Sequence, residues 1–231
     1  MREGLTPAAG RIALAAMAKV PVRGEVKTRL CPPLTLAQAA ELGRCLLADR
    51  VEQLGAVPLS DRLVAFWPPE REPEARELVP AGLRLVAQHG EDLGARMARL
   101  LSDLLAEGYA GAIVVGTDTP TLPTAYLEEA CALLRSGAVD VTVGPAEDGG
   151  YYLIGLGAPA PELFIDMPWG GTSVYAETLA RARAHGRRLA VLPSWFDVDR
   201  PADLTRLTQA PQANDAYRPR RTLGFLARLR A

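Results

Sequence analysis

Near its start the chain reads Ile12-Ala-Leu-Ala-Ala-Met-Ala18, and a loop rich in cations and proline follows over residues 19–33. Thr35 then stands where a helix cap is expected, and leucine and alanine recur at helical spacing to about Leu54. A run of four to eight apolar residues bounded by polar ones is typical of a buried strand. This stretch therefore predicts a strand, a loop and a helix in succession.

The same alternation continues along the chain. Further strands are predicted at Leu63–Trp67, Leu83–Ala87, Ala112–Gly116, Val139–Val143, Tyr151–Leu156 and Arg188–Leu192. Further helices are predicted at Glu70–Leu78, Asp92–Glu107, Thr124–Arg135, Ser173–His185 and Pro201–Leu207. Strands that alternate with helices favour a mostly parallel sheet covered on both faces. We therefore expect a three-layer α/β/α fold, which allows an antiparallel edge near residues 151–156 after a glycine turn.

Length and composition suit one large globular domain or two small ones, because the 231 residues are 48% hydrophobic and 23% charged. We expect an N-terminal extension at residues 1–10, one domain at residues 11–210 and a basic C-terminal tail at residues 211–231. The tail carries five arginines against Asp215 and a short amphipathic stretch, so we expect it to dock on the domain or a partner, peripheral to catalysis. The formal net charge of −1 disfavours a nucleic-acid partner.

The cysteines and histidines give no metal or disulfide pattern. The three cysteines lie far apart and there are only two histidines, so a reducing cytoplasm is the simplest location. The apolar run 12–18 ends in an A-x-A pattern after two arginines, which is also compatible with a signal peptide. The run has only the minimum length for that, so we prefer the buried strand and expect no membrane span.

Ligands of parallel α/β sheets bind at the carboxyl ends of the strands. The loop after the first strand holds four cations, Lys19, Arg23, Lys27 and Arg29. These cations, with Gly24 allowing close backbone approach, suit a polyphosphate, although a solvated basic turn is the alternative. The loop contains only half of a Walker A pattern, and no G-x-G-x-x-G follows a strand, so neither a P-loop nor a dinucleotide-binding domain is predicted.

Acidic residues follow two other predicted strands. Asp118 comes directly after the strand at 112–116, and Asp197 and Asp199 follow the last strand with side chains expected on one side. Mg²⁺ prefers one or two carboxylates together with phosphate oxygens and water, so Asp118 and this pair could hold one metal ion. The alternatives are a turn role for Asp118 and a cap of the terminal helix for Asp197 and Asp199.

Two more loops are candidates for substrate contacts. Residues 144–152 contain Glu147, Asp148 and the pair Gly149 and Gly150, which indicate either a hairpin turn or a site of close substrate approach. In the loop at 88–94 the backbone amides could bind a nucleobase or phosphate, or Asp92 could only cap the next helix. No G-x-S-x-G elbow is present, so the pattern favours metal-assisted transfer at a phosphate over nucleophilic hydrolysis.

Six segments in combination resemble the rSAM/selenodomain-associated transferase 1 family over about residues 11–207. They are VKTRL at 26–30, residues 88–97, GTDTPTLP at 116–123, GPAEDGGYYLIGL at 144–156, PWGGTSV at 168–174 and FDVD at 196–199. That family is similar to the nucleotide-diphospho-sugar transferase (GT-A) superfamily, which includes molybdenum-cofactor (MobA-like) guanylyltransferases. The resemblance implies a GT-A fold and a Mg²⁺- or Mn²⁺-dependent transferase that uses a nucleoside triphosphate or nucleotide sugar and a small-molecule acceptor.

The resemblance also implies roles for particular residues. It assigns the donor's phosphates and nucleotide to Lys19, Arg23, Lys27, Arg29, Gly90, Asp92 and Leu93. It assigns the acceptor to Asp148, Gly149, Gly150 and Trp169, and the metal to Asp118 and Asp199, with Asp197 as the weaker match. Lys27 and Asp118 are the catalytic candidates. In two places the chain departs from the superfamily: Lys19-Val-Pro replaces the usual glycines, and the guanylyltransferases resembled have a shorter acceptor segment without EDGGYY.

Three functions remain open from the sequence. The first is a glycosyl- or nucleotidyltransferase, and the second is a guanylyltransferase that acts on 2-phospholactate or phosphoenolpyruvate. The third is a nucleotide-binding accessory protein without turnover. The sequence predicts neither the donor base, nor the acceptor, nor the oligomeric state.

Overall fold

The computed structural model describes residues 7, 9–209 and 216–229, so most of the expected N-terminal extension and the start of the tail lie outside the described residues. Its sheet has seven strands in the order β3-β2-β1-β4-β6-β5-β7. The strands are β1 (Ile12–Lys19), β2 (Ser60–Trp67), β3 (Arg84–Ala87), β4 (Gly111–Gly116), β5 (Val141–Pro145), β6 (Tyr151–Leu156) and β7 (Leu189–Val191). The helices are α1 (Leu36–Leu54), α2 (Glu72–Glu77), α3 (Leu93–Ala106), α4 (Thr124–Arg135), α5 (Val174–Ala184), α6 (Pro201–Gln209) and α7 (Arg220–Arg228).

The first apolar run is a central strand. β1 pairs in parallel with β2 on one side and with β4 on the other, and its residues from Ile12 to Ala16 have no exposed surface. The cap predicted for the next helix is also present, because the Thr35 hydroxyl accepts from the Gln38 amide and the Gln38 side chain accepts from the Thr35 amide. Strand, loop and helix therefore follow one another as the sequence predicts.

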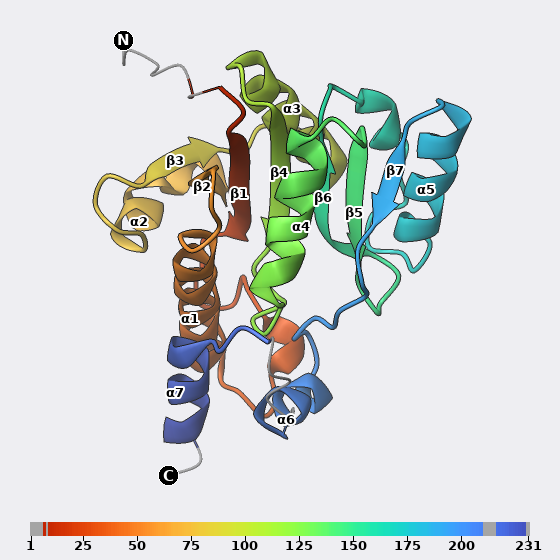
Figure 1. The fold of residues 1–231 in the computed structure, drawn as a ribbon. Helices are drawn as coiled ribbons and strands as arrows, with labels where there is room; N and C mark the ends of the chain where they lie inside the picture. Colours follow the sequence, from red (N-terminus) through yellow and green to blue (C-terminus); the bar gives the residue numbers. More distant parts are fainter. Residues whose placement is uncertain (1–6, 8, 210–215, 230–231) are drawn as a thin grey trace.

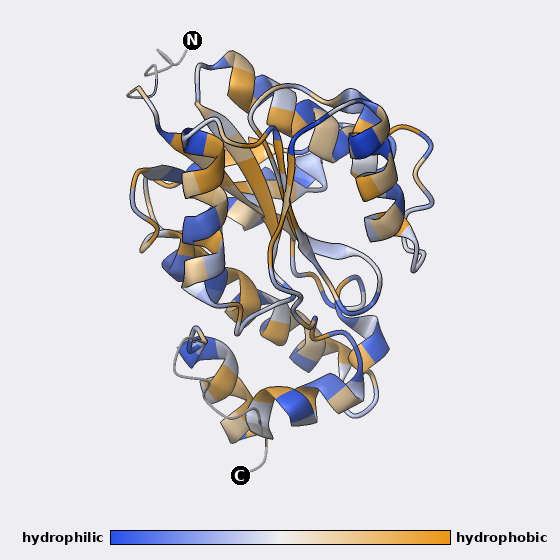
Figure 2. Ribbon diagram, turned by 45° about the vertical axis from the view of Figure 1, so that its right-hand side comes forward, coloured by the Kyte–Doolittle hydropathy of each residue, from blue (hydrophilic) through white to orange (hydrophobic). Residues whose placement is uncertain are grey.

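The sheet is covered on both faces (Figure 1). Alternate residues of β1 enter two separate apolar clusters: Ile12 and Leu14 pack with residues of α1 and α4, whereas Ala13 and Ala15 pack with residues of α3 and α5. Figure 2 shows hydrophobic strands at the centre of the molecule and, around them, helices in which hydrophilic and hydrophobic residues alternate. The three-layer α/β/α class and the mostly parallel sheet are confirmed. None of the helices in the described ranges is both long and apolar enough to span a membrane.

The position of β6 corrects one expectation. β6 is antiparallel to both neighbours, but it lies between β4 and β5 and not at an edge of the sheet, whose edges are β3 and β7. The connection from β5 to β6 is too short for a helical crossover, so β6 must return beside β5 in the opposite direction. The next crossover then places β7 parallel to β5 on its other side.

The described part of the tail docks on the same chain, with α7 lying beside α1 (Figure 1). Phe225 and Leu226 of α7 are buried in a third apolar cluster with residues of α1 and α6, and this cluster also contains Phe196 and Val198. The buried Asp49 carboxylate accepts from the amides of Arg221 and Thr222 at 3.1 and 2.8 Å, and so caps α7. The domain boundaries and the peripheral role of the tail remain predictions.

We expect Asp49→Ala to lower the free energy of unfolding by about 1–2 kcal/mol, because it removes the acceptor for two amides at the start of α7. Glu52→Ala is the matched control, since Glu52 lies on the same helix and pairs with the same Arg221, but half exposed. An exposed pair contributes about 0–1 kcal/mol. Urea unfolding measures both values, and equal losses would contradict the capping role.

Candidate active site

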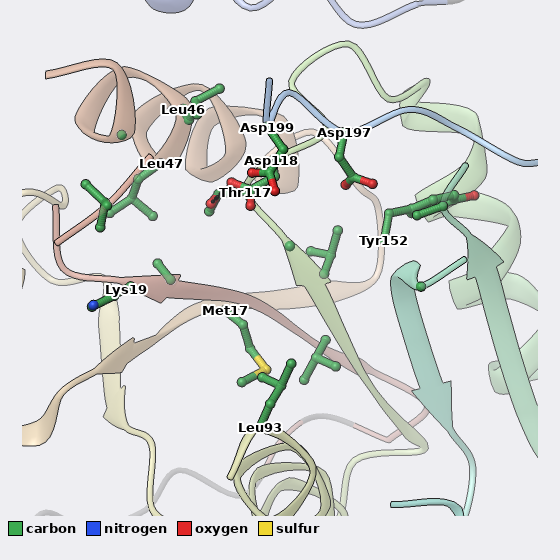
Figure 3. A pocket seen from close by; sticks show the side chains of 18 of the residues that line it. Met17, Lys19, Leu46, Leu47, Leu93, Thr117, Asp118, Tyr152, Asp197 and Asp199 are labelled. Carbon is green, nitrogen blue, oxygen red and sulfur yellow. Dashed lines mark hydrogen bonds between the residues drawn. The ribbon is translucent and has the colours of Figure 1, made fainter. Parts of the chain in front are cut away.

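A pocket of about 510 Å³ opens at the carboxyl ends of β1 and β4, where the topology predicts a ligand site. Figure 3 shows its acidic side, with Asp118 and Asp199 close together and Asp197 nearby. Eight residues named from the sequence line it: Lys19, Lys27, Leu93, Asp118, Asp148, Gly150, Asp197 and Asp199. Six others, Arg23, Arg29, Gly90, Asp92, Gly149 and Trp169, lie outside its lining. The functional roles of all fourteen remain predictions.

Lys27 is the centre of the acidic side. Its Nζ lies 2.8 Å from Asp118 Oδ1 and 2.9 Å from Asp199 Oδ1, and it donates to the Val198 carbonyl at 2.8 Å. The Lys27 side chain is 7% exposed, whereas the two carboxylates are 44% and 39% exposed. Burial alone would lower the pKa of Lys27, but the two carboxylates outweigh it and raise this pKa above its ordinary value. The side chain is therefore a charged ammonium held by two acids.

The segment 193–199 brings Asp197 and Asp199 close to Asp118. The Val198 amide donates to the Asp118 carbonyl at 2.8 Å, and the Trp195 indole donates to the Thr121 hydroxyl at 3.2 Å. The helix-cap alternative for Asp199 is wrong, because Asp203 accepts the amides of Asp199 and Arg200 just before α6. The Asp199 carboxylate instead faces Lys27, so the juxtaposition with Asp118 that the strand order predicts is present.

Asp197 lines the same pocket and has a different environment. Burial, together with the carboxylates of Asp118 and Asp148 and against the opposing effect of Lys27, raises its pKa to about 7. Asp118, Asp197 and Asp199 thus share a region of negative potential. Both Asp197 and Asp199 line the pocket, as the alternation along the strand predicts. The family resemblance instead favoured Asp199 over Asp197 as the metal ligand.

The carboxylates of Asp118 and Asp199 suit a divalent cation whose remaining ligands come from the substrate and water. One cationic atom already contacts an oxygen of both Asp118 and Asp199, which shows that the two carboxylates can share a cation. Within the described residues no group of three or more His, Cys, Asp or Glu side chains could hold a metal ion. Two carboxylates with phosphate oxygens and water match the preference of Mg²⁺.

Arg50 supports the loop that carries Asp118, a role that was not predicted from the sequence. This side chain of α1 is 2% exposed, and its Nη2 donates to both the carbonyl and the hydroxyl of Thr119 at 2.7 Å. Gln53, one turn further on, donates to the Leu122 carbonyl at 2.6 Å. Burial lowers the pKa of Arg50 to about 10. The available signal was the helical spacing of Arg50 and Gln53 with Leu46 and Leu54, which places two polar side chains on an apolar face of α1.

The other cations of the first loop differ in their partners. The Lys19 ammonium donates to the Glu25 carbonyl at 3.0 Å, and the Glu25 carboxylate pairs with Arg71 at 2.8 Å. Arg29 is 75% exposed and lies 3.3 Å from Asp199. Arg23 is exposed. A purely solvated turn would not bury Lys27, so the loop combines one buried cation with exposed ones.

The loop before α3 uses Asp92 as a cap. Asp92 Oδ1 accepts from the Ala95 amide at 2.7 Å, which is the structural alternative stated for this residue. Gly90 has a φ of +148°, and a Cβ there would lie 2.7 Å from the Arg96 nitrogen, so the tight approach of this loop to α3 requires glycine. Leu93 is the residue of this loop that reaches the pocket.

The segment 144–150 forms the predicted hairpin turn between β5 and β6. Asp148 Oδ1 accepts from the Gly150 amide at 2.9 Å, and Gly149 has a φ of +93°. Glu147 points to α6, where Arg206 donates to its two oxygens at 2.5 and 2.8 Å. Of the two acids in this loop, Asp148 therefore faces the pocket, and Glu147 ties the loop to α6.

Trp169 contributes to the wall behind the pocket. Its ring meets that of Tyr151 edge-on at 6.4 Å, and a Cβ on Gly94 would lie 2.5 Å from its Cζ2 atom. Its indole nitrogen is buried and has no hydrogen-bond partner among the described residues. Trp169 thus packs against α3 and a lining residue, which is compatible with an indirect effect on the acceptor.

Comparisons with known proteins agree with this architecture. The sequence profile of a family described as an uncharacterized protein conserved in bacteria (DUF2064) matches residues 50–171. No curated protein matches the sequence significantly. The structure is similar to that of a Desulfovibrio desulfuricans G20 protein provisionally assigned as a nucleotide-diphospho-sugar transferase, with 30% identity, a TM-score of 0.86 and coverage of 94% of each chain.

More distant structures share the fold alone. A nucleotidyl transferase from Methanothermobacter has 19% identity and a TM-score of 0.52, with coverage of 85% of this chain and 95% of that one. CMP:2-keto-3-deoxy-manno-octonic acid synthetase, solved with CTP, has 13% identity and a TM-score of 0.50, with coverage of 85% and 96%. The predicted nucleotide-diphospho-sugar transferase-like fold is confirmed.

Proposed function

The chain belongs to the DUF2064 family, and we propose that it is a transferase that binds a nucleoside triphosphate or a nucleotide sugar with Mg²⁺ or Mn²⁺. The observation that carries the proposal is the contact of Lys27 with Asp118 and Asp199 inside a pocket at the carboxyl ends of the strands. The similar protein from Desulfovibrio desulfuricans G20 supports a nucleotide sugar as donor. The two more distant transferases support a nucleotide as donor, because this chain shares their fold.

In this proposal the two sides of the pocket have different tasks. Asp118 and Asp199 hold the divalent cation, which when bound neutralises charge on the donor's phosphates. Lys27, with Lys19, Arg23 and Arg29, orients the phosphates by charge-assisted hydrogen bonds. We assign the nucleotide to Gly90, Asp92 and Leu93 and the acceptor to Asp148, Gly149, Gly150 and Trp169, of which Leu93, Asp148 and Gly150 line the pocket. As in other phosphoryl chemistry, the protein mainly positions groups and balances charge.

Thermal melts with Mg²⁺ and a panel of donors test the proposal. GTP, CTP, UTP, ATP, UDP-sugars and GDP-sugars are added separately, and the correct donor should stabilise the protein by about 2.7 kcal/mol at a free concentration 100 times its Kd. Consumption of a triphosphate would assign nucleotidyl transfer, and consumption of a nucleotide sugar would assign glycosyl transfer. Stabilisation without turnover would favour an accessory protein, and no shift with any donor would overturn the proposal.

A further inference from the structure

The Lys27 ammonium and a metal ion would compete for the same two carboxylates. Lys27 Nζ contacts one oxygen of Asp118 and one of Asp199, at 2.8 and 2.9 Å. These are the residues that hold the cation in the proposed function, on which this inference rests. A divalent ion bound to the same two oxygens would displace the ammonium from them.

We propose that Lys27 is the built-in counter-ion of the Asp118–Asp199 pair and exchanges places with the divalent cation when a polyphosphate arrives to accept its ammonium. The exchange moves no proton and breaks no covalent bond. It gives Lys27 two successive tasks: it neutralises the acids in the free protein and binds the donor's phosphates in the complex. Metal and donor would therefore bind together more tightly than either binds alone.

Burial explains why the free protein needs this counter-ion. The side chain of Lys27 is almost fully buried, and its third contact is the Val198 carbonyl at 2.8 Å. Asp118 and Asp199 bring two like charges to one point beside the partly buried Asp197. Without a cation between them the carboxylates would repel one another, and a buried ammonium without acceptors would be equally unfavourable.

The chemistry of lysine makes the exchange feasible. An ammonium on a flexible four-carbon stem is a point charge with three donors, so it can change acceptors without a fixed planar geometry. The same loop presents Lys19 at the pocket and the exposed Arg29 beside Asp199, so a polyphosphate in the pocket would meet several cations. A triphosphate offers Lys27 new oxygens and at the same time supplies oxygens to the metal.

The exchange predicts opposite effects of one substitution. Lys27→Met should bind Mn²⁺ alone about tenfold or more tightly than the wild type, because a competing unit charge a few ångströms away is removed. The same variant should bind inorganic tripolyphosphate, in the presence of saturating Mn²⁺, about tenfold more weakly, because a charge-assisted hydrogen bond is lost. A residue that only binds phosphate would leave the affinity for Mn²⁺ alone unchanged.

Lys19→Met is the matched control. It removes the same charge from the same loop and the same pocket, but the Lys19 ammonium contacts Glu25 and neither Asp118 nor Asp199. We expect Lys19→Met to weaken tripolyphosphate binding and to change the affinity for Mn²⁺ alone by less than about threefold, since exposed charges are screened. Lys27→Gln keeps a polar group at the buried position and guards against misfolding of the methionine variant.

Electron paramagnetic resonance of free Mn²⁺ and calorimetry with tripolyphosphate measure both affinities in the full chain. Tighter Mn²⁺ binding by both Lys27 variants, with weaker tripolyphosphate binding and no change in Lys19→Met for Mn²⁺ alone, would support the exchange. Mn²⁺ binding no tighter than in the wild type, or an equal gain in Lys19→Met, would overturn it. The donor panel judges the proposed function separately, because a donor that stabilises the wild type supports that function whichever way Lys27 behaves.

Discussion

Asp118→Asn is expected to reduce metal-dependent transfer by about a hundredfold or more while the protein remains folded. A neutral amide is a much poorer ligand for a hard divalent cation than a carboxylate, so the cation would no longer be shared with Asp199. The asparagine side chain keeps an oxygen that can accept from Lys27, and the ammonium also keeps its contacts with Asp199 and the Val198 carbonyl, so the variant should remain folded. Asp199→Asn should have the same effect, since it removes the second carboxylate of the pair.

The measurement combines Mn²⁺ binding with turnover of the donor that the thermal melts identify. Asp103→Asn on α3 is the matched control, because Asp103 is 68% exposed, pairs with Arg99 on the surface and lies outside the pocket lining. It should bind metal and turn over like the wild type. Unchanged metal dependence in both Asp118→Asn and Asp199→Asn would show that the two acids do not hold the cation.

The second large effect is expected at Arg50. Arg50→Ala should lower the free energy of unfolding by roughly 2–4 kcal/mol, because it leaves a cavity and removes the donor to both oxygens of Thr119. It should also weaken Mn²⁺ binding, since the loop that carries Asp118 loses its support from α1. Urea unfolding and Mn²⁺ titration measure the two effects.

Arg44→Ala provides the comparison for Arg50. Arg44 lies on the same helix, is 46% exposed and pairs only with the nearby Glu41 among the described residues, so its loss should change stability by less than about 0.5 kcal/mol. If Arg50→Ala proves as mild as Arg44→Ala, the buried contacts to Thr119 do not stabilise the loop. If it lowers stability without changing metal binding, Arg50 supports the fold and not the site.

The sequence was sufficient to predict the strands and helices, and to predict that the loops carrying Asp118 and Asp199 lie close together. The run at 12–18 has the length and apolar character of an interior strand, and β1 occupies the middle of the sheet. Asp118 and Asp199 each follow a predicted strand, and in a mostly parallel sheet such positions gather at one edge. Their proximity therefore follows from local patterns and topology alone.

Contacts between individual side chains could not be predicted in this way. Lys27 pairs with Asp199, which is 172 residues away, and nothing in the local pattern distinguishes it from the other cations of its loop. The pairing of strands was also not predictable in full. β6 lies in the interior of the sheet because it pairs with β4, and this pairing is determined by tertiary packing and not by the local sequence. The cap of α7 is another such contact. It is supplied by Asp49, which belongs to α1, and a local sequence pattern does not reveal a cap that comes from a different helix.

Diffraction from crystals soaked with Mn²⁺ and the nucleotide donor from the thermal melts would show whether Asp118 and Asp199 hold the cation. The anomalous signal of manganese locates the ion without reference to any assumed chemistry. We expect one strong peak in contact with Asp118 and Asp199, the donor's phosphates against the loop at residues 19–33, and the Lys27 ammonium moved from the carboxylates to the phosphates. A nucleotide bound away from this pocket, or manganese without contact to either aspartate, would show that this is not the metal and donor site.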